Sequence, residues 1–173
     1  VWWEGLTKQA PEGLTTWNEV TSVIKEAKEA ETFELSVNYR NTKQIIDFSN
    51  KILSPFTTEY LPIPINRMGP EPVVTSFSDN SDLLKKFKSD ITEDAKNLDK
   101  TVGIIAFTPE LYEEALKITE SLDLPKEQKI ILRANDKIVY LQKAIYLTKF
   151  EDCKGLEFSK VYVLGANVNN SSN

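Results

Sequence analysis

The stretch VGIIAF, Val102 to Phe107, decides the fold class of this chain. Six consecutive apolar residues have the length of a strand, and the lack of alternation is typical of a strand with helices on both faces. Thr108 and Pro109 follow directly, as a cap and a first-turn proline, and predict a helix over Glu110 to Ser121. A buried strand that leads straight into a helix indicates a parallel α/β sheet.

The sequence on both sides of this stretch repeats the pattern. Apolar runs predict strands at Val73 to Phe77, Ile130 to Leu132, Ile145 to Phe150 and Val161 to Leu164. Helical periodicity predicts a helix over Asp79 to Asn97, and Ile138 to Ala144 is either helix or strand. Alternating strands and helices predict a doubly wound parallel α/β sheet.

The first third of the chain adds a helix, a strand and a second helix. Apolar residues three and four apart predict a helix over Thr16 to Glu31, and strict alternation predicts a strand over Phe33 to Tyr39. Asn41, with Gln44 three residues on, is the expected cap of the next helix, which Pro55 ends. The five prolines of Ser54 to Pro72 indicate a long connection.

Composition excludes several chemistries. The 173 residues fit one domain and contain no histidine and a single cysteine, Cys153, which excludes a Ser-His-Asp triad, a histidine-bearing zinc site and an internal disulfide. Residues 1–123 carry a net charge of -8 and residues 124–173 one of +3, so only the last third suits a polyanion. Without a signal peptide or membrane-length apolar run in this sequence, we expect a cytoplasmic protein, with a disordered tail at Asn167 to Asn173.

Two segments carry residues suited to chemistry. In the first, Tyr39 and Arg40 stand between a predicted strand and a capped helix, where anions bind, and would offer a ring for stacking and a guanidinium for phosphate. In the second, Lys154 to Phe158, Gly155 permits an unusual backbone angle and Glu157 could accept hydrogen bonds from sugar hydroxyls. The alternatives are a surface arginine beside a core tyrosine, and an ordinary turn with a solvated carboxylate.

In this order, the motifs resemble a known family. LSVNYRNTKQIIDFSNKI at Leu35 to Ile52, the strand Val102 to Phe107, and KGLEFSKVYVLG at Lys154 to Gly165 are similar to the second RecA-like domain of UvrD/Rep-type superfamily 1 helicases. Asn66 to Pro72 (NRMGPEP) resembles the connection of the helicase IV or HelD-like branch. The resemblance implies a RecA-like, three-layer α/β domain over residues 33–166, with residues 1–32 as a helical lead-in. No G-x-x-x-x-G-K-S/T phosphate loop occurs in the sequence.

The resemblance also implies roles. Tyr39 would stack on adenine and Arg40 would contact the γ-phosphate, while Glu157 and Gly155 would approach the nucleotide. The phosphate-binding lysine and the ligands of Mg²⁺ would come from a first RecA-like domain that this sequence does not contain. ATP with Mg²⁺, single-stranded DNA, that first domain and RNA polymerase are the expected partners.

The sequence departs from the family's pattern at the residues that contact single-stranded DNA. Thr-x-His usually precedes the K-G-L-E segment, and here Lys149, Phe150 and Glu151 stand there. Thr108, Lys149 and Lys154 are the candidate nucleic-acid contacts, the alternative being a helix cap and solvated lysines. Three functions stay open: half of an ATP-dependent DNA helicase or translocase, a HelD-like module that binds RNA polymerase, and a degenerate domain with no nucleotide role.

Overall fold

A computed structural model describes residues 22, 36–56, 61–133 and 143–166. The chain divides into two compact units, Val1–Thr75 (unit 1) and Ser76–Asn173 (unit 2). Both contain parallel strands, and three helices of eleven or more residues lie in the described ranges, so the protein is an α/β protein. The predicted helix at Thr16 to Glu31 and the predicted disordered tail fall outside the described residues, Ser22 excepted.

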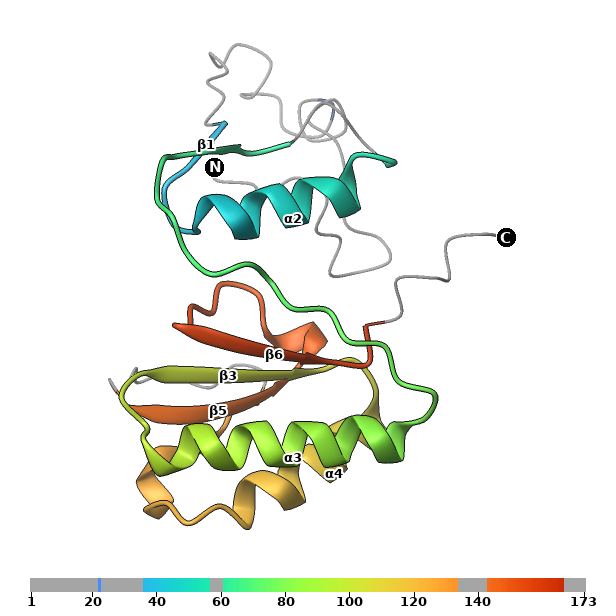
Figure 1. Ribbon diagram of the computed structural model, residues 1–173, viewed down its shortest axis with the longest axis vertical. Helices are drawn as coiled ribbons and strands as arrows, with labels where there is room; N and C mark the ends of the chain where they lie inside the picture. Colours follow the sequence, from blue (N-terminus) through green and yellow to red (C-terminus); the bar gives the residue numbers. More distant parts are fainter. Residues whose placement is uncertain (1–21, 23–35, 57–60, 134–142, 167–173) are drawn as a thin grey trace. The chain divides into compact units, whose positions relative to one another are not determined.

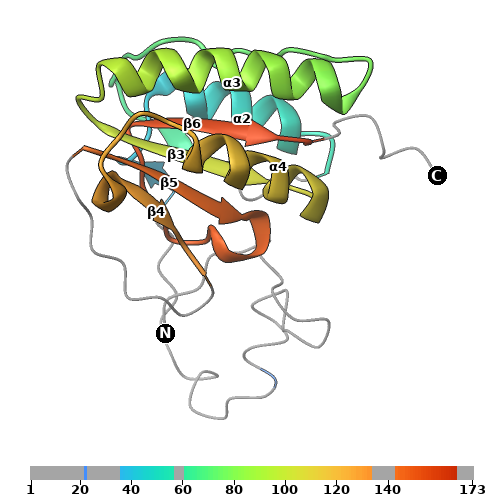
Figure 2. The same cartoon turned by 90° about the horizontal axis from the view of Figure 1, so that it is seen from below.

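Unit 2 is built on a four-stranded parallel sheet in the order β4-β5-β3-β6 (Figure 2). The strands are β3 (Thr101–Ala106), β4 (Lys129–Ile131), β5 (Ala144–Lys149) and β6 (Lys160–Leu164). The sequence predicts all four to within about two residues. β3 pairs with β5 on one side and β6 on the other, and this central position explains its unbroken apolar run.

Two helices, α3 (Asn80–Lys96) and α4 (Pro109–Glu120), pack against one face of this sheet (Figure 1). The side chains of Asp79 and Thr108 cap them by accepting hydrogen bonds from Asp82 N and Leu111 N. The core between helices and sheet is formed by buried side chains of Phe87, Ile91, Leu111, Ala115, Val102, Ile104, Ile145 and Leu147.

The opposite face of the sheet differs from the prediction. Within the described residues no helix covers it; the connection from β5 to β6 returns across it and packs Leu156 and Phe158 on Tyr146. A Cβ on Gly103 would lie 2.2 Å from the Phe158 ring, so the glycine in β3 admits this aromatic side chain. Val161 and Val163 remain about half exposed on this face.

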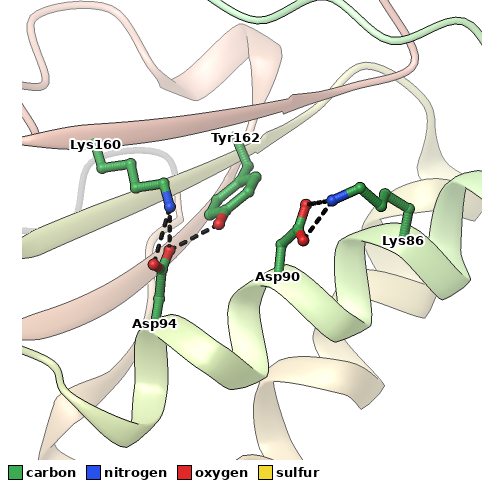
Figure 3. Close-up of polar contacts among 5 residues, drawn as sticks. All are labelled: Lys86, Asp90, Asp94, Lys160 and Tyr162. Carbon is green, nitrogen blue, oxygen red and sulfur yellow. Dashed lines mark hydrogen bonds and ion pairs between the residues drawn. The ribbon is translucent and has the colours of Figure 1, made fainter. Parts of the chain in front are cut away.

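Polar contacts join α3 to the edge strand β6 (Figure 3). Lys160 Nζ lies 2.9 and 2.7 Å from the carboxylate oxygens of Asp94, and the Tyr162 hydroxyl donates to Asp94 Oδ2 at 2.7 Å. Partial burial raises the pKa of Tyr162 to about 12. The second ion pair in the figure, Lys86 with Asp90, lies within α3 alone.

Unit 1 places strand β1 (Val37–Asn38) parallel to β2 (Ile63–Pro64), with helix α2 (Lys43–Leu53) following β1. The predicted helix before Pro55 is confirmed, but its predicted cap is wrong: Thr42 is the N-cap, and its side chain makes no capping bond. Asn38 Oδ1 accepts from the amide of Asn41, and Gln44 Oε1 accepts from Gly69 N, so neither half of the expected capping box forms. Of the predicted strand Phe33 to Tyr39, residues 33–35 lie outside the described ranges.

One predicted strand is wrong. Residues 73–77 form no strand, because no described strand pairs with them. Val73 and Val74 are 89% and 64% exposed. Among the helices that the structure describes, none is long and apolar enough to cross a membrane.

Candidate functional site

Tyr39 and Arg40 occupy a tight turn between β1 and α2. Asn38 Oδ1 accepts hydrogen bonds from the amides of Arg40 and Asn41, both at 3.0 Å. This is the geometry of an Asx-turn, in which an asparagine side chain bonds backbone amides two or three residues further on. The Tyr39 side chain is 73% exposed and Arg40 is exposed, so the alternative that places Tyr39 in a core is wrong.

The segment Arg67 to Gly69 lies against this turn and the first residues of α2. Arg67 Nη1 donates to the carbonyl oxygen of Arg40 at 3.0 Å, and the carbonyl of Arg67 accepts from Lys43 N at 2.7 Å. Gly69 N donates to Gln44 Oε1 at 2.9 Å, and a Cβ on Gly69 would lie 2.5 Å from Thr42 Cγ2. The approach of these two segments therefore depends on the glycine.

In unit 2, the carboxyl ends of β3 and β5 form a second candidate site. The connection after β3 runs into α4 on one face, whereas the connection after β5 returns over the other face. Adjacent parallel strands whose connections leave toward opposite faces open a crevice where α/β proteins commonly bind ligands. Thr108 follows β3, and Lys149 ends β5.

Two aromatic side chains that the sequence analysis did not select lie at this position. Phe107 and Phe150 stack with ring centroids 4.2 Å apart and planes at 28°, and they are 37% and 49% exposed. Both rings therefore present apolar surface to solvent at the carboxyl edge of the sheet. The available signal was position, because each phenylalanine is the last residue of a predicted strand. That the two strands are neighbours is known only from the structure.

The charges beside this aromatic pair are mixed. Lys149 Nζ lies 5.2 Å above the Tyr112 ring, while Glu110 and Glu151 are exposed nearby in the sequence. Hydrogen bonds from its own backbone amide and from the Thr108 hydroxyl lower the pKa of Glu110, which therefore stays charged. Thr108 is the N-cap of α4. This agrees with the alternative given for Thr108 above, a helix cap in place of a nucleic-acid contact.

The Lys154 to Glu157 segment lies on the β5 to β6 connection. Gly155 has a φ of +82°, which confirms the unusual backbone angle, and a Cβ there would meet no atom within 4 Å. Leu156 packs against the sheet with Phe158, which leaves Lys154 and Glu157 exposed. Burial raises the pKa of the neighbouring Cys153 thiol, which keeps it protonated at neutral pH.

The predicted site residues thus fall into two sets. Tyr39 and Arg40 belong to unit 1, and Thr108, Lys149, Lys154, Gly155 and Glu157 belong to unit 2. Within the described ranges, no three acidic or cysteine side chains gather to hold a metal ion. Comparison of the chain with protein-family models gave no match, and comparison with curated proteins gave none either.

Proposed function

We propose that this chain is the second RecA-like half of an ATP-dependent DNA helicase or translocase. In this proposal it forms one wall of a nucleotide site, and the first RecA-like domain of the same protein forms the other. The same proposal holds that the chain has the three-layer RecA-like architecture and that the protein is cytoplasmic. The observation that carries it is the Tyr39-Arg40 pair, exposed in a turn that directly precedes helix α2.

The chemistry of that pair suits a nucleoside triphosphate. An exposed tyrosine ring offers a stacking surface for adenine, and a guanidinium can donate two parallel hydrogen bonds to phosphate oxygens. In phosphoryl transfer, an arginine stabilises the charge that develops on the transferring group. Mg²⁺ and the lysine of a phosphate loop would be supplied by the other domain.

Single-stranded nucleic acid is the second proposed ligand. Phe107 and Phe150 offer exposed ring surface at the carboxyl edge of the sheet, and bases stack on aromatic rings with little sequence preference. Lys149 and Lys154 supply positive charge for the phosphates, and Thr108 lies at the start of α4. Stacking would take the place of the polar contact that the family's Thr-x-His provides.

The test is ATP turnover by the full-length protein that carries this chain. Arg40→Ala should lower kcat by about 10³-fold or more, because the transferring phosphoryl group loses its arginine. Lys51→Ala, an exposed lysine in the last turn of α2, is the matched control and should turn over ATP like the parent protein. Unchanged turnover in Arg40→Ala would overturn the proposal.

An alternative is a HelD-like module that binds RNA polymerase and uses ATP to switch conformation. The acidic Glu110 and Glu151 near the aromatic pair favour this alternative, since they repel the phosphates of a strand. Salt-sensitive binding of single-stranded DNA by the full-length protein would favour the translocase. Copurification with polymerase, without strand binding, would favour the alternative.

A further inference from the structure

Arg67 is a residue of unit 1 to which the proposed function gives no role. It lies 27 residues after Arg40, on the proline-rich segment that follows β2, yet its guanidinium reaches the carbonyl oxygen of Arg40 at 3.0 Å. Its own carbonyl accepts from Lys43 N at 2.7 Å, so the same residue contacts both the turn and the first residue of α2.

The turn is therefore held from two directions. Asn38 fixes the amide of Arg40 from the side of β1, and Arg67 fixes the carbonyl of Arg40 from the other side. With amide and carbonyl both bonded, the Arg40 backbone has little freedom, so the direction in which its side chain leaves the turn is set. A backbone carbonyl bonded by a charged donor makes a stronger contact than a neutral pair.

We propose that Arg67 is a positioning residue of the nucleotide site, which fixes the turn that presents Tyr39 and Arg40 to ATP. This inference rests on the proposed function. Arg67 acts through the Arg40 carbonyl, and its effect is on how precisely the Arg40 guanidinium meets the developing charge. A misplacement of about 1 Å at a reacting group can lower a rate about 10²-fold, so loss of this contact should reduce turnover markedly.

The experiment compares Arg67→Ala, Arg67→Lys, Arg40→Ala and the control Lys51→Ala in the full-length protein, with kcat and KM for ATP measured for each. Arg67→Ala should lower kcat about 10²-fold with a smaller change in KM, because the arginine that it positions acts on the transition state. Arg67→Lys should recover most of kcat, since an ammonium can donate to the same carbonyl.

Amide hydrogen exchange separates positioning from folding. The Lys43 amide bonds to the backbone of residue 67, so it should stay protected in Arg67→Ala if the segment remains docked. Loss of Lys43 protection in both Arg67 variants, with equal loss of turnover, would overturn the inference and assign Arg67 a purely structural role.

The kinetic outcomes distinguish the two proposals. Parent-like kcat in Arg67→Ala, beside a large loss in Arg40→Ala, would overturn the inference and leave the proposed function standing. Parent-like kcat in Arg40→Ala would overturn both, because a site that does not use Arg40 does not need it positioned.

Discussion

The described residues of units 1 and 2 make different kinds of contact. In the described ranges every buried apolar side chain except Ile46 lies in unit 2, where α3 and α4 pack against the parallel sheet. The Tyr39-Arg40 turn of unit 1 is instead held by directed hydrogen bonds from Asn38 and Arg67. Removal of a single hydrogen bond at the turn should therefore reduce its function. In unit 2, truncation of a buried apolar side chain should instead lower the free energy of unfolding.

The largest expected effect on stability is in the core of unit 2. Ile104 is fully buried in the central strand, so Ile104→Ala removes apolar contacts and leaves a cavity. The free energy of unfolding of the Ile104→Ala variant, measured by urea titration, should be lower than that of the parent protein by about 2 to 5 kcal/mol. Val163→Ala, on the half-exposed face of β6, is the control and should change stability far less. Equal effects would contradict the contrast between the two faces.

An intermediate effect is expected at the exposed aromatic pair. Phe150→Ala removes a ring that is half exposed, so it should weaken binding of single-stranded DNA by the full-length protein by about 1 to 3 kcal/mol. Fluorescence anisotropy at fixed salt measures this loss. Phe56→Ala, which removes an exposed ring from unit 1, is the matched control. Unchanged affinity of Phe150→Ala for single-stranded DNA would show that the aromatic pair does not contact the DNA.

The smallest effect is a pH dependence in unit 2. Burial raises the pKa of Tyr162 to about 12 from 10, so the unfolded chain loses this proton first as pH rises. The associated stability is present below pH 10 and is lost as pH rises toward 12; after allowance for solvent screening it is about 1 kcal/mol. Tyr162→Phe should flatten this part of a stability profile, and an unchanged profile would refute the assignment.

The sequence predicted unit 2 well and unit 1 less well, for physical reasons. Buried strands and capped helices leave local patterns, and β3, α4 and the Thr108 cap were predicted from them. The predicted N-cap of α2 was wrong because other partners bond the groups that a capping box would use. Asn38 bonds the amide of Asn41 at short range, and Gly69, 25 residues from Gln44, bonds the Gln44 side chain. Residues 73–77 have a strand pattern, but none of the strands in the described ranges pairs with them.

The candidate site was predictable only where one residue type carries the signal. Gly155 has the positive φ that its place in the K-G-L-E segment indicated, and Tyr39 and Arg40 are exposed beside a helix start. The Phe107-Phe150 stack and the Arg67 contact join residues 43 and 27 positions apart. Contacts of this kind depend on the folded path of the chain, which local periodicity does not encode.

The central claim, that this chain is one wall of a divided nucleotide site, is tested most directly by ATP turnover of the 173-residue chain alone. We predict no hydrolysis above background, with or without single-stranded DNA, beside clear turnover by the full-length protein at the same concentration. Steady hydrolysis by the chain alone that Arg40→Ala abolishes would contradict the claim, because it would show a complete site within these residues.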